Sequence, residues 1–254
     1  MTTMTSIDIN CDMGELIDGQ HNYDDKIMPY ISSCNISCGF HSGHPALIEK
    51  TIKCALENKV AIGAHPSYDD KENFGRRSMN IPLSEVQSLI KYQVSAIKGM
   101  VESHGSTLHH IKAHGALYND MHKDEQIARA IIEAVQEVHK NAIIYIMAGS
   151  SLTHICEQMN MDYKEEVFAD RSYTDINTLQ SRHIDGAVIS DTDKVLQRID
   201  DITNFRLLDI NKNSIEIHPD TICVHSDTAN SQGIAKSIFH HLSNKNIEIS
   251  AHRR

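Results

Sequence analysis

Polar and apolar residues alternate in a segment near the start of the chain. In residues 7 to 15, which read IDINCDMGE, one apolar residue separates Asp8 from Asn10 and another separates Asn10 from Asp12. Successive side chains of a β-strand point to opposite faces, so this pattern predicts a strand with one apolar face and one solvated polar face. Glu15 follows directly. We therefore expect this strand to bring carboxylates into a functional site.

Three later segments alternate in the same way and also end in charged or hydrogen-bonding groups. They are residues 61 to 65 (AIGAH), 109 to 114 (HHIKAH) and 222 to 227 (ICVHSD). In the second of them Lys112 and His114 share one face, opposite to apolar neighbours. Repetition of this kind is typical of parallel strands around a polar-mouthed interior, with helices outside.

Amphipathic helical patterns lie between these segments. After Pro45, which suits the first turn of a helix, apolar residues recur at helical spacing as far as Leu56. Ser84 and Gln87 form a capping box, which predicts the start of another helix that ends near Gly105. Further helical patterns occupy residues 127 to 138, 152 to 159, 195 to 199 and 234 to 242.

Strands that alternate with helices predict a parallel barrel or an open doubly wound sheet. Residues 34 to 38 add a short strand, and residues 142 to 147 (AIIYIM) add a fully apolar one. The pattern then contains about seven strands, which favours an irregular seven-stranded parallel (β/α) barrel over an eight-fold one. Residues 16 to 30 are expected to form a loop, and the polar tail from Asn244 is expected to fray. We predict a single barrel domain over residues 1 to 254.

Composition and charge narrow the class of protein. The 254 residues are 40% hydrophobic and carry a net charge of −10, which argues against partners such as nucleic acid or an anionic membrane. No apolar run approaches the ~20 residues that cross a bilayer, and the first residues, MTTMTS, lack the pattern of a signal peptide. The six cysteines have no CxxC spacing. We interpret them as buried free thiols, which predicts a cytoplasmic location.

The predicted strand ends bring many ionisable side chains to one mouth. Carboxylates and imidazoles there could bind a divalent metal that activates water, and Asp12, His41 and His65 are the residues that we predict for it. A carboxylate or histidine could instead act directly as general base. Lysine and arginine could hold an anionic substrate or a developing oxyanion. The pattern of residues leaves these uses open.

Structural explanations compete with the functional ones at several positions. Lys112 could form a structural ion pair with Asp12 or Glu15. His44 could cap the helix that follows it, and Cys38 fits a core position better than a nucleophile. These alternatives predict the same strands and differ only in what the side chains contact.

Several longer motifs resemble those of one known family. The sequence of residues 7 to 240 is similar to the LamB/YcsF family, whose motifs occur here in the same order: INCDMGE, NISCGFHSGHP, VAIGAHPSYDD, NFGRR, HHIKAHGALYND, EVFADRSY and DTICVHSDT. The resemblance implies a barrel related to the glycoside hydrolase and polysaccharide deacetylase barrels. It also implies ATP-dependent hydrolysis of 5-oxo-L-proline (pyroglutamate) to L-glutamate, performed together with separate B and C subunits.

The same resemblance implies roles for individual residues. The implied catalytic residues are Asp12, His65, Lys112 and His114. The implied substrate-binding residues are Glu15, His41, Arg76, Asp170, Arg171, His225 and Asp227. The chain has no P-loop pattern, so ATP is expected to act through the complex, partly or wholly on the partner subunits. The family motif GFHAGDP reads GFHSGHP here, so His44 replaces an acid.

Two other functions are compatible with this sequence. One is a metal-dependent, deacetylase-like carbohydrate hydrolase that acts alone on an acetylated sugar. The other is a carrier without catalytic activity that delivers pyroglutamate to the partner subunits. Activity without ATP would distinguish the first, and turnover that survives every single change at the mouth would distinguish the second.

Overall fold

Seven parallel strands form a closed ring in the computed structural model, which describes residues 4 to 16, 22 to 175 and 177 to 251. The strands are β1 Ser6–Met13, β2 Ser33–Ser37, β3 Ala61–His65, β4 His110–Ile111, β5 Ile143–Met147, β6 Asp162–Phe168 and β11 Thr221–Val224. Each pairs with the next, and β11 closes the ring by pairing with β1. The prediction of an irregular seven-stranded parallel (β/α) barrel is confirmed.

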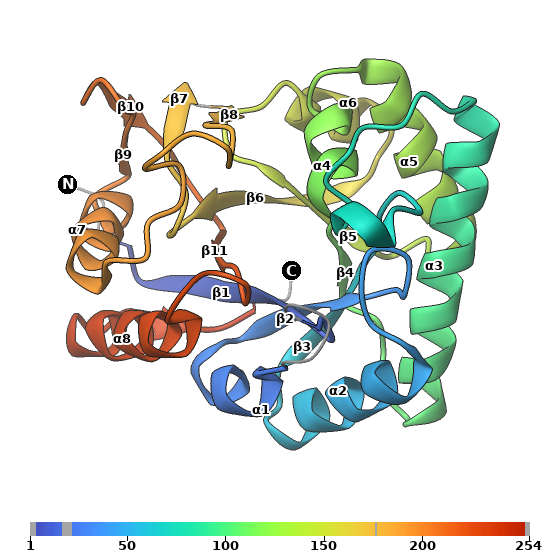
Figure 1. The fold of residues 1–254 in the computed structure, drawn as a ribbon, viewed down its shortest axis with the longest axis horizontal. Helices are drawn as coiled ribbons and strands as arrows, with labels where there is room; N and C mark the ends of the chain where they lie inside the picture. The colour runs from blue at the N-terminus through green and yellow to red at the C-terminus, as the bar shows by residue number, and fades with distance from the viewer. Residues whose placement is uncertain (1–3, 17–21, 176, 252–254) are drawn as a thin grey trace.

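Helices surround the ring on its outside (Figure 1). The longer ones are α2 Pro45–Glu57, α3 Leu83–Ser103, α5 Glu125–Val138, α7 Thr192–Thr203 and α8 Ser231–Asn244. The shorter ones are α1 Asp24–Ile27, α4 Gly115–Met121 and α6 Leu152–Gln158, with 3-10 turns η1 Met28–Tyr30 and η2 Lys71–Asn73. The apolar stripe predicted for α3, from Val86 to Val101, is buried. Within the described residues, no helix combines the length and apolar character needed to cross a membrane.

Polar side chains fill the inside of the ring. Asp8, Asn10 and Asp12 are each at most 3% exposed, although the alternation predicted a solvated face for them. That expectation is wrong because the closed ring replaces water with hydrogen bonds between side chains. The Asp8 carboxylate accepts hydrogen bonds from the hydroxyl groups of Ser32, Ser33, Tyr145 and Thr221.

Gly63 of β3 leaves the space that the His110 ring occupies. A Cβ atom on Gly63 would stand 2.2 Å from His110 Nε2. The ring stacks on Tyr145 with 4.0 Å between centroids, and Nε2 donates a hydrogen bond of 2.7 Å to Asn35. Contacts on several sides therefore fix this imidazole inside the barrel.

Two antiparallel hairpins and a terminal strand add to the predicted elements. The hairpins pair β7 Tyr173–Asp175 with β8 Thr178–Leu179 and β9 Arg206–Leu208 with β10 Ser214–Glu216. The strand β12 Glu248–Ile249 pairs in parallel with the first residues of β1. The expectation that the tail frays is therefore wrong as far as residue 251, because backbone hydrogen bonds hold it against the barrel.

Two local predictions near helix starts are also wrong. Residues 16 to 30, expected to be a loop, contain α1 and η1, while residues 17 to 21 lie outside the described part of the chain. The helix α3 begins at Leu83, so Ser84 lies inside it and caps nothing. Gln87 bonds to Glu133 on α5 instead of completing a capping box.

Candidate active site

A cavity of about 930 Å³ opens at the carboxyl ends of the barrel strands. Asp12, His65, Lys112 and His225 reach it from the ends of β1, β3, β4 and β11. Asp12 is the only acidic residue of the described chain that lines it, whereas the arginines that line it are Arg76, Arg77, Arg171 and Arg182. The cavity is therefore basic in a chain whose net charge is −10, and it suits an anionic ligand.

Lys112 is buried among acidic and polar partners. Its Nζ lies 2.9 Å from Glu166 Oε1, 3.3 Å from Asp12 Oδ1 and 2.9 Å from Cys223 Sγ. Burial lowers the pKa of Lys112, but Asp12, Cys223 and Glu166 outweigh it and hold the pKa well above its usual value. The side chain is therefore a charged ammonium. Of the two ion pairs that the structural alternative allowed for Lys112, the pair with Asp12 is present, and Glu166, not Glu15, is the second acidic partner.

Asp12 is held as a carboxylate at the centre of this network. Burial raises its pKa, but His65 and Lys112 lower it to well below the usual value. Its Oδ1 accepts hydrogen bonds from Asn35 at 2.8 Å and from Lys112 at 3.3 Å. A carboxylate with so low a pKa and with its oxygen already bonded is a weak proton acceptor.

The hydrogen bonds of His65 and His114 identify one protonated nitrogen on each ring. His65 Nδ1 lies 2.7 Å from the backbone oxygen of Lys112, and His114 Nε2 lies 2.8 Å from that of Phe74. A carbonyl oxygen only accepts, so both of these nitrogens carry hydrogen. The other nitrogens, His65 Nε2 and His114 Nδ1, face each other at 2.9 Å. Burial holds the pKa of His114 well below its usual value, so its ring is neutral.

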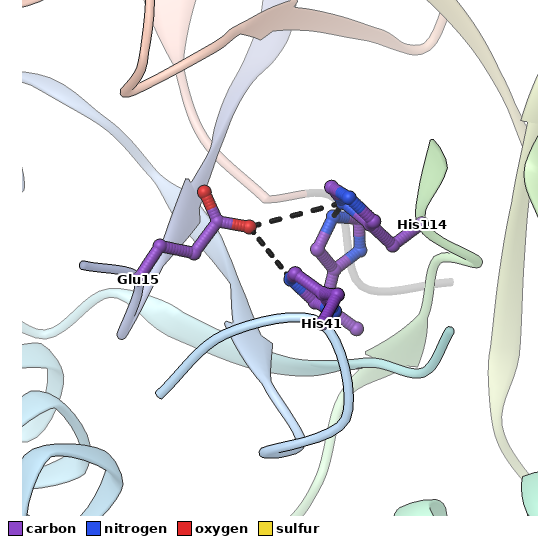
Figure 2. A group of neighbouring side chains, drawn as sticks. Glu15, His41 and His114 are labelled. Carbon is purple, nitrogen blue, oxygen red and sulfur yellow. Dashed lines mark hydrogen bonds and ion pairs between the residues drawn. The ribbon is translucent and has the colours of Figure 1, made fainter. Parts of the chain in front are cut away.

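Glu15 and His41 lie beside His114, as Figure 2 shows. His41 Nε2 is 2.8 Å from Glu15 Oε1, and His114 Nδ1 is 3.8 Å from the same oxygen. The rings of His41 and His114 stack with 3.7 Å between centroids. Burial lowers the pKa of His41, while burial together with Asp12 and Asp227 raises that of Glu15.

The group of donors that could hold a metal keeps two of the three predicted residues. The structure groups His41 and His65 with Glu15 and His114, with one ligand atom of each lying within 4.8 Å of the others. Asp12 is not in this group, although its Oδ1 lies 3.3 Å from His65 Nε2, and it belongs to a second group with Cys223 and His225.

Asp170 and His225 form a pair behind the cavity. Asp170 Oδ1 is 2.8 Å from His225 Nδ1, and Oδ2 accepts the backbone N–H of His225 at 3.1 Å. Burial raises the pKa of Asp170, but the opposing effect of His225 and Thr228 is larger and brings the pKa down to about 2. Asp170 therefore orients the imidazole of His225, which is the member of the pair that lines the cavity.

Arg76 and Arg182 converge on Asp227 from two different loops. Arg76 donates a hydrogen bond to the Asp227 carboxylate, and Arg182 Nη1 lies 3.4 Å from the same oxygen. The family resemblance implies substrate-binding roles for Arg76 and Asp227, but the sequence analysis missed Arg182, since nothing in its SRHIDG context marks it. Asp227 thus positions two guanidinium groups that line the cavity.

Arg171 and His44 also take part in local structure. The Arg171 guanidinium donates to the backbone oxygens of Gln180 and Ala187, so it holds the neighbouring loop as well as lining the cavity. His44 is the N-cap of α2, where its Nδ1 accepts the Leu47 N–H at 3.4 Å. The capping alternative for His44 is thereby confirmed.

The Asp170–His225 pair predicts an acid-sensitive contribution to folding. A carboxyl whose folded pKa of about 2 lies below the ordinary 3.8 stabilises the fold at neutral pH and loses this effect as the pH falls from about 4 to 2. Asp170→Asn is expected to lose about 2 kcal/mol or more at pH 7 and less at pH 2, measured by urea unfolding. The exposed Asp69→Asn is the control, and an equal loss for Asp170→Asn at both pH values would contradict the assignment.

The fold and the cavity together define a (β/α)-barrel protein with an enzyme-type site. In such barrels the carboxyl ends of the strands are where active sites are built, and here they carry a buried ammonium, carboxylates and imidazoles. The chain belongs to the LamB/YcsF family, whose sequence model matches residues 7 to 254. The resemblance seen in the motifs is confirmed.

Known proteins similar to this chain include a relative of assigned function. The chain is 41% identical over 250 residues to the A subunit of 5-oxoprolinase from Brevibacillus brevis, and the match covers 98% of each chain. It is also similar to the crystal structure of the lactam utilization protein from Thermus thermophilus, with a TM-score of 0.90 and 29% identity over 97% of this chain and 100% of that one. A family 4 carbohydrate esterase from Streptomyces lividans shares the fold alone, with a TM-score of 0.50 and 10% identity over 98% and 94%.

Proposed function

We propose that this chain is the A subunit of an ATP-dependent 5-oxoprolinase, which hydrolyses 5-oxo-L-proline to L-glutamate. The observation that carries the proposal is the 41% identity, over 98% of both chains, to the Brevibacillus brevis protein of that name. The B and C subunits are the proposed partners. The six free cysteines favour the reducing cytoplasm as the location of the complex.

The basic cavity supports this substrate. 5-Oxoproline carries a carboxylate, and a phosphorylated form of it would carry further negative charge. Arg76 and Arg182 line the cavity and share a single acidic partner, Asp227, so that one positive charge is left over between them. In our proposal these guanidinium groups hold the carboxylate of the substrate.

ATP enters the proposed reaction through the partner subunits. They transfer the γ-phosphoryl group of ATP to the amide oxygen of the ring and release ADP, and this transfer makes the ring carbon C5 more electrophilic. Water then adds to C5, the bond from C5 to nitrogen breaks, and the nitrogen takes up a proton. Hydrolysis of the resulting acyl phosphate releases L-glutamate and phosphate. The absence of a P-loop pattern from this chain agrees with that division of labour.

Lys112 and the two facing histidines have distinct proposed roles. The Lys112 ammonium lines the cavity and is charged, so it stabilises the negative charge on the oxygen that water adds to C5, as that oxygen loses its proton. His65 Nε2 and His114 Nδ1 position the attacking water, because these nitrogens are not committed to backbone carbonyls. Asp12 anchors Lys112 and His65, and its low pKa makes it a weak base.

The experiment that tests the function is ATP-linked formation of glutamate from 5-oxoproline by this chain, with and without B and C subunits. We expect glutamate only when all three subunits and ATP are present. Turnover by B and C without this chain would contradict the proposal.

A metal-dependent deacetylase is the second candidate, and the donor group of Glu15 and three histidines favours it. It predicts release of acetate from an acetylated sugar by this chain alone, without ATP. The carrier alternative predicts that the isolated chain binds 5-oxoproline but that no single change at the mouth stops turnover. The same purified chain serves for both assays.

A further inference from the structure

Two histidines at the cavity have the hydrogen bonds that metal-ligating histidines have. In most metal sites the nitrogen that does not bind the ion donates to a carbonyl or carboxylate, which fixes the ring and aims the other lone pair at the metal. His65 Nδ1 and His114 Nε2 do this with the backbone oxygens of Lys112 and Phe74, at 2.7 and 2.8 Å. Both acceptors are backbone oxygens, so the fold fixes the direction in which the other nitrogen of each ring points.

The two lone pairs aimed in this way converge with two more donors. His65 Nε2 and His114 Nδ1 are 2.9 Å apart, and His65 Nε2 is also 3.3 Å from Asp12 Oδ1. Glu15 Oε1 is 3.8 Å from His114 Nδ1 and 2.8 Å from His41 Nε2. The four side chains come from the ends of three strands and one loop and are at most 5% exposed.

We infer that Glu15, His41, His65 and His114 form a binding site for one divalent transition-metal ion of the zinc type. Nitrogen and carboxylate donors in a group of four are the set that Zn²⁺ takes in tetrahedral sites. Bond lengths of ~2.0 to 2.1 Å place tetrahedral ligand atoms about 3.3 Å apart. Three separations between donor atoms of these side chains, 2.8, 2.9 and 3.8 Å, lie on both sides of that value.

His41 can adopt the tautomer that such an ion needs. Its Nε2 faces Glu15, while its Nδ1 has no hydrogen-bond partner within the described residues. The ring proton therefore has a place on Nδ1 when Nε2 binds the ion. Nδ1 would then carry a buried N–H without an acceptor among the described residues, a cost that binding of the ion has to offset.

The second donor group in the barrel is a weaker candidate for a metal. It consists of Asp12, Cys223 and His225. Cys223 Sγ lies 2.9 Å from the Lys112 ammonium and Asp12 Oδ1 lies 3.3 Å from it, and a fixed positive charge so close repels a second cation. Because Lys112 already neutralises that group, we assign the ion to the histidine group alone.

An ion at this site would lie next to the cavity. His65 and His114 line the cavity, whereas Glu15 and His41 stand behind them, so an ion enters from the cavity side. Because the four side chains fill a tetrahedral shell, a water of lowered pKa would need a fifth position on the ion, and it would then take over from the two histidines as the source of the nucleophile in the proposed function. The binding itself does not depend on the proposed function, because it follows from the four side chains.

The test is the metal content of the purified full-length chain without an affinity tag. The chain is stripped with a chelator, titrated with Zn²⁺ or Co²⁺ by calorimetry, and examined by X-ray absorption at the metal edge. We expect one ion per chain, bound only by nitrogen and oxygen. A sulfur ligand in the absorption spectrum, or no binding at micromolar Zn²⁺, would overturn the inference, and neither result requires a variant to fold.

Variants then locate the ion. His65→Gln and His114→Gln, checked for folding by circular dichroism, are each expected to weaken binding by more than about 100-fold. His44→Gln, in the same loop as His41 but acting as a helix cap, is the matched control and is expected to keep the ion. Cys223→Ser is also expected to keep it. Loss of the ion in Cys223→Ser, or its retention in both histidine variants, would contradict the site.

Discussion

Lys112→Met is expected to lower the rate of glutamate formation about 100- to 1,000-fold in the three-subunit assay. Loss of a single preorganised donor to a developing oxyanion has an effect of this size. The variant is also expected to lose about 3–5 kcal/mol of folding stability, because Asp12 and Glu166 would be left buried without their positive partner. Urea unfolding measures the second effect, so the rate can be read on protein shown to be folded.

Lys164→Met is the matched control for this change. Lys164 is also buried, but its Nζ is 3.7 Å from Asp220, which is about one third exposed and can be hydrated when the lysine is removed. We expect the control to keep its turnover and to lose about 1 kcal/mol or less. Undiminished turnover in folded Lys112→Met would remove Lys112 from the mechanism.

Gly63→Ala is expected to lower the free energy of unfolding by about 3 kcal/mol. The new methyl group would stand 2.2 Å from His110 Nε2 and 2.4 Å from its Cδ2, much closer than atoms can approach. The ring cannot swing away freely, because Tyr145 stacks on it and Asn35 accepts its hydrogen bond. Overpacking of a fixed core position has costs of this size.

Gly99→Ala is the control for the glycine change. Gly99 lies in α3, and a Cβ atom there would meet nothing within 4 Å. The substitution is expected to stabilise the chain by about 0.5 to 1 kcal/mol, since alanine favours helix. Truncation of the ring in a Gly63→Ala/His110→Ala double variant is expected to relieve the clash. A Gly63→Ala chain as stable as the wild type would show that the barrel wall yields at this point.

The strands and the mouth of the barrel could be predicted from period-two alternation. Alternation fixes which side chains share a face, and parallel strands bring their carboxyl ends to one edge, so Asp12, His65 and Lys112 were expected together. The pattern does not distinguish a solvated face from one buried among polar partners. For that reason Asp8 and Asn10 were expected in water and are found inside a closed ring.

Other parts of the site depend on contacts that no local pattern encodes. Glu166 alternates with Phe168 and Asp170, so the face on which it lies could be predicted. Glu165 beside it carries the same charge, however, and charge alone does not tell the two apart. Arg182 reaches Asp227 from a loop whose course is set by tertiary contacts. The group that could hold a metal contains Glu15 and His114 in place of Asp12. This difference depends on how the rings are oriented in space, which the sequence pattern does not give.

The hydrogen-bonded interior of the barrel has a consequence for how this protein can change over time. Asn10 donates hydrogen bonds to Glu166 and to Thr221. Thr221 donates one to Asp8, which also accepts one from Tyr145. A substitution at one of these positions leaves the hydrogen-bond partners of the lost side chain unpaired and buried away from water. The effects of substitutions there are therefore non-additive. Inside the ring, substitutions are expected to accumulate in coordinated sets, whereas on the outer helices they can accumulate one residue at a time.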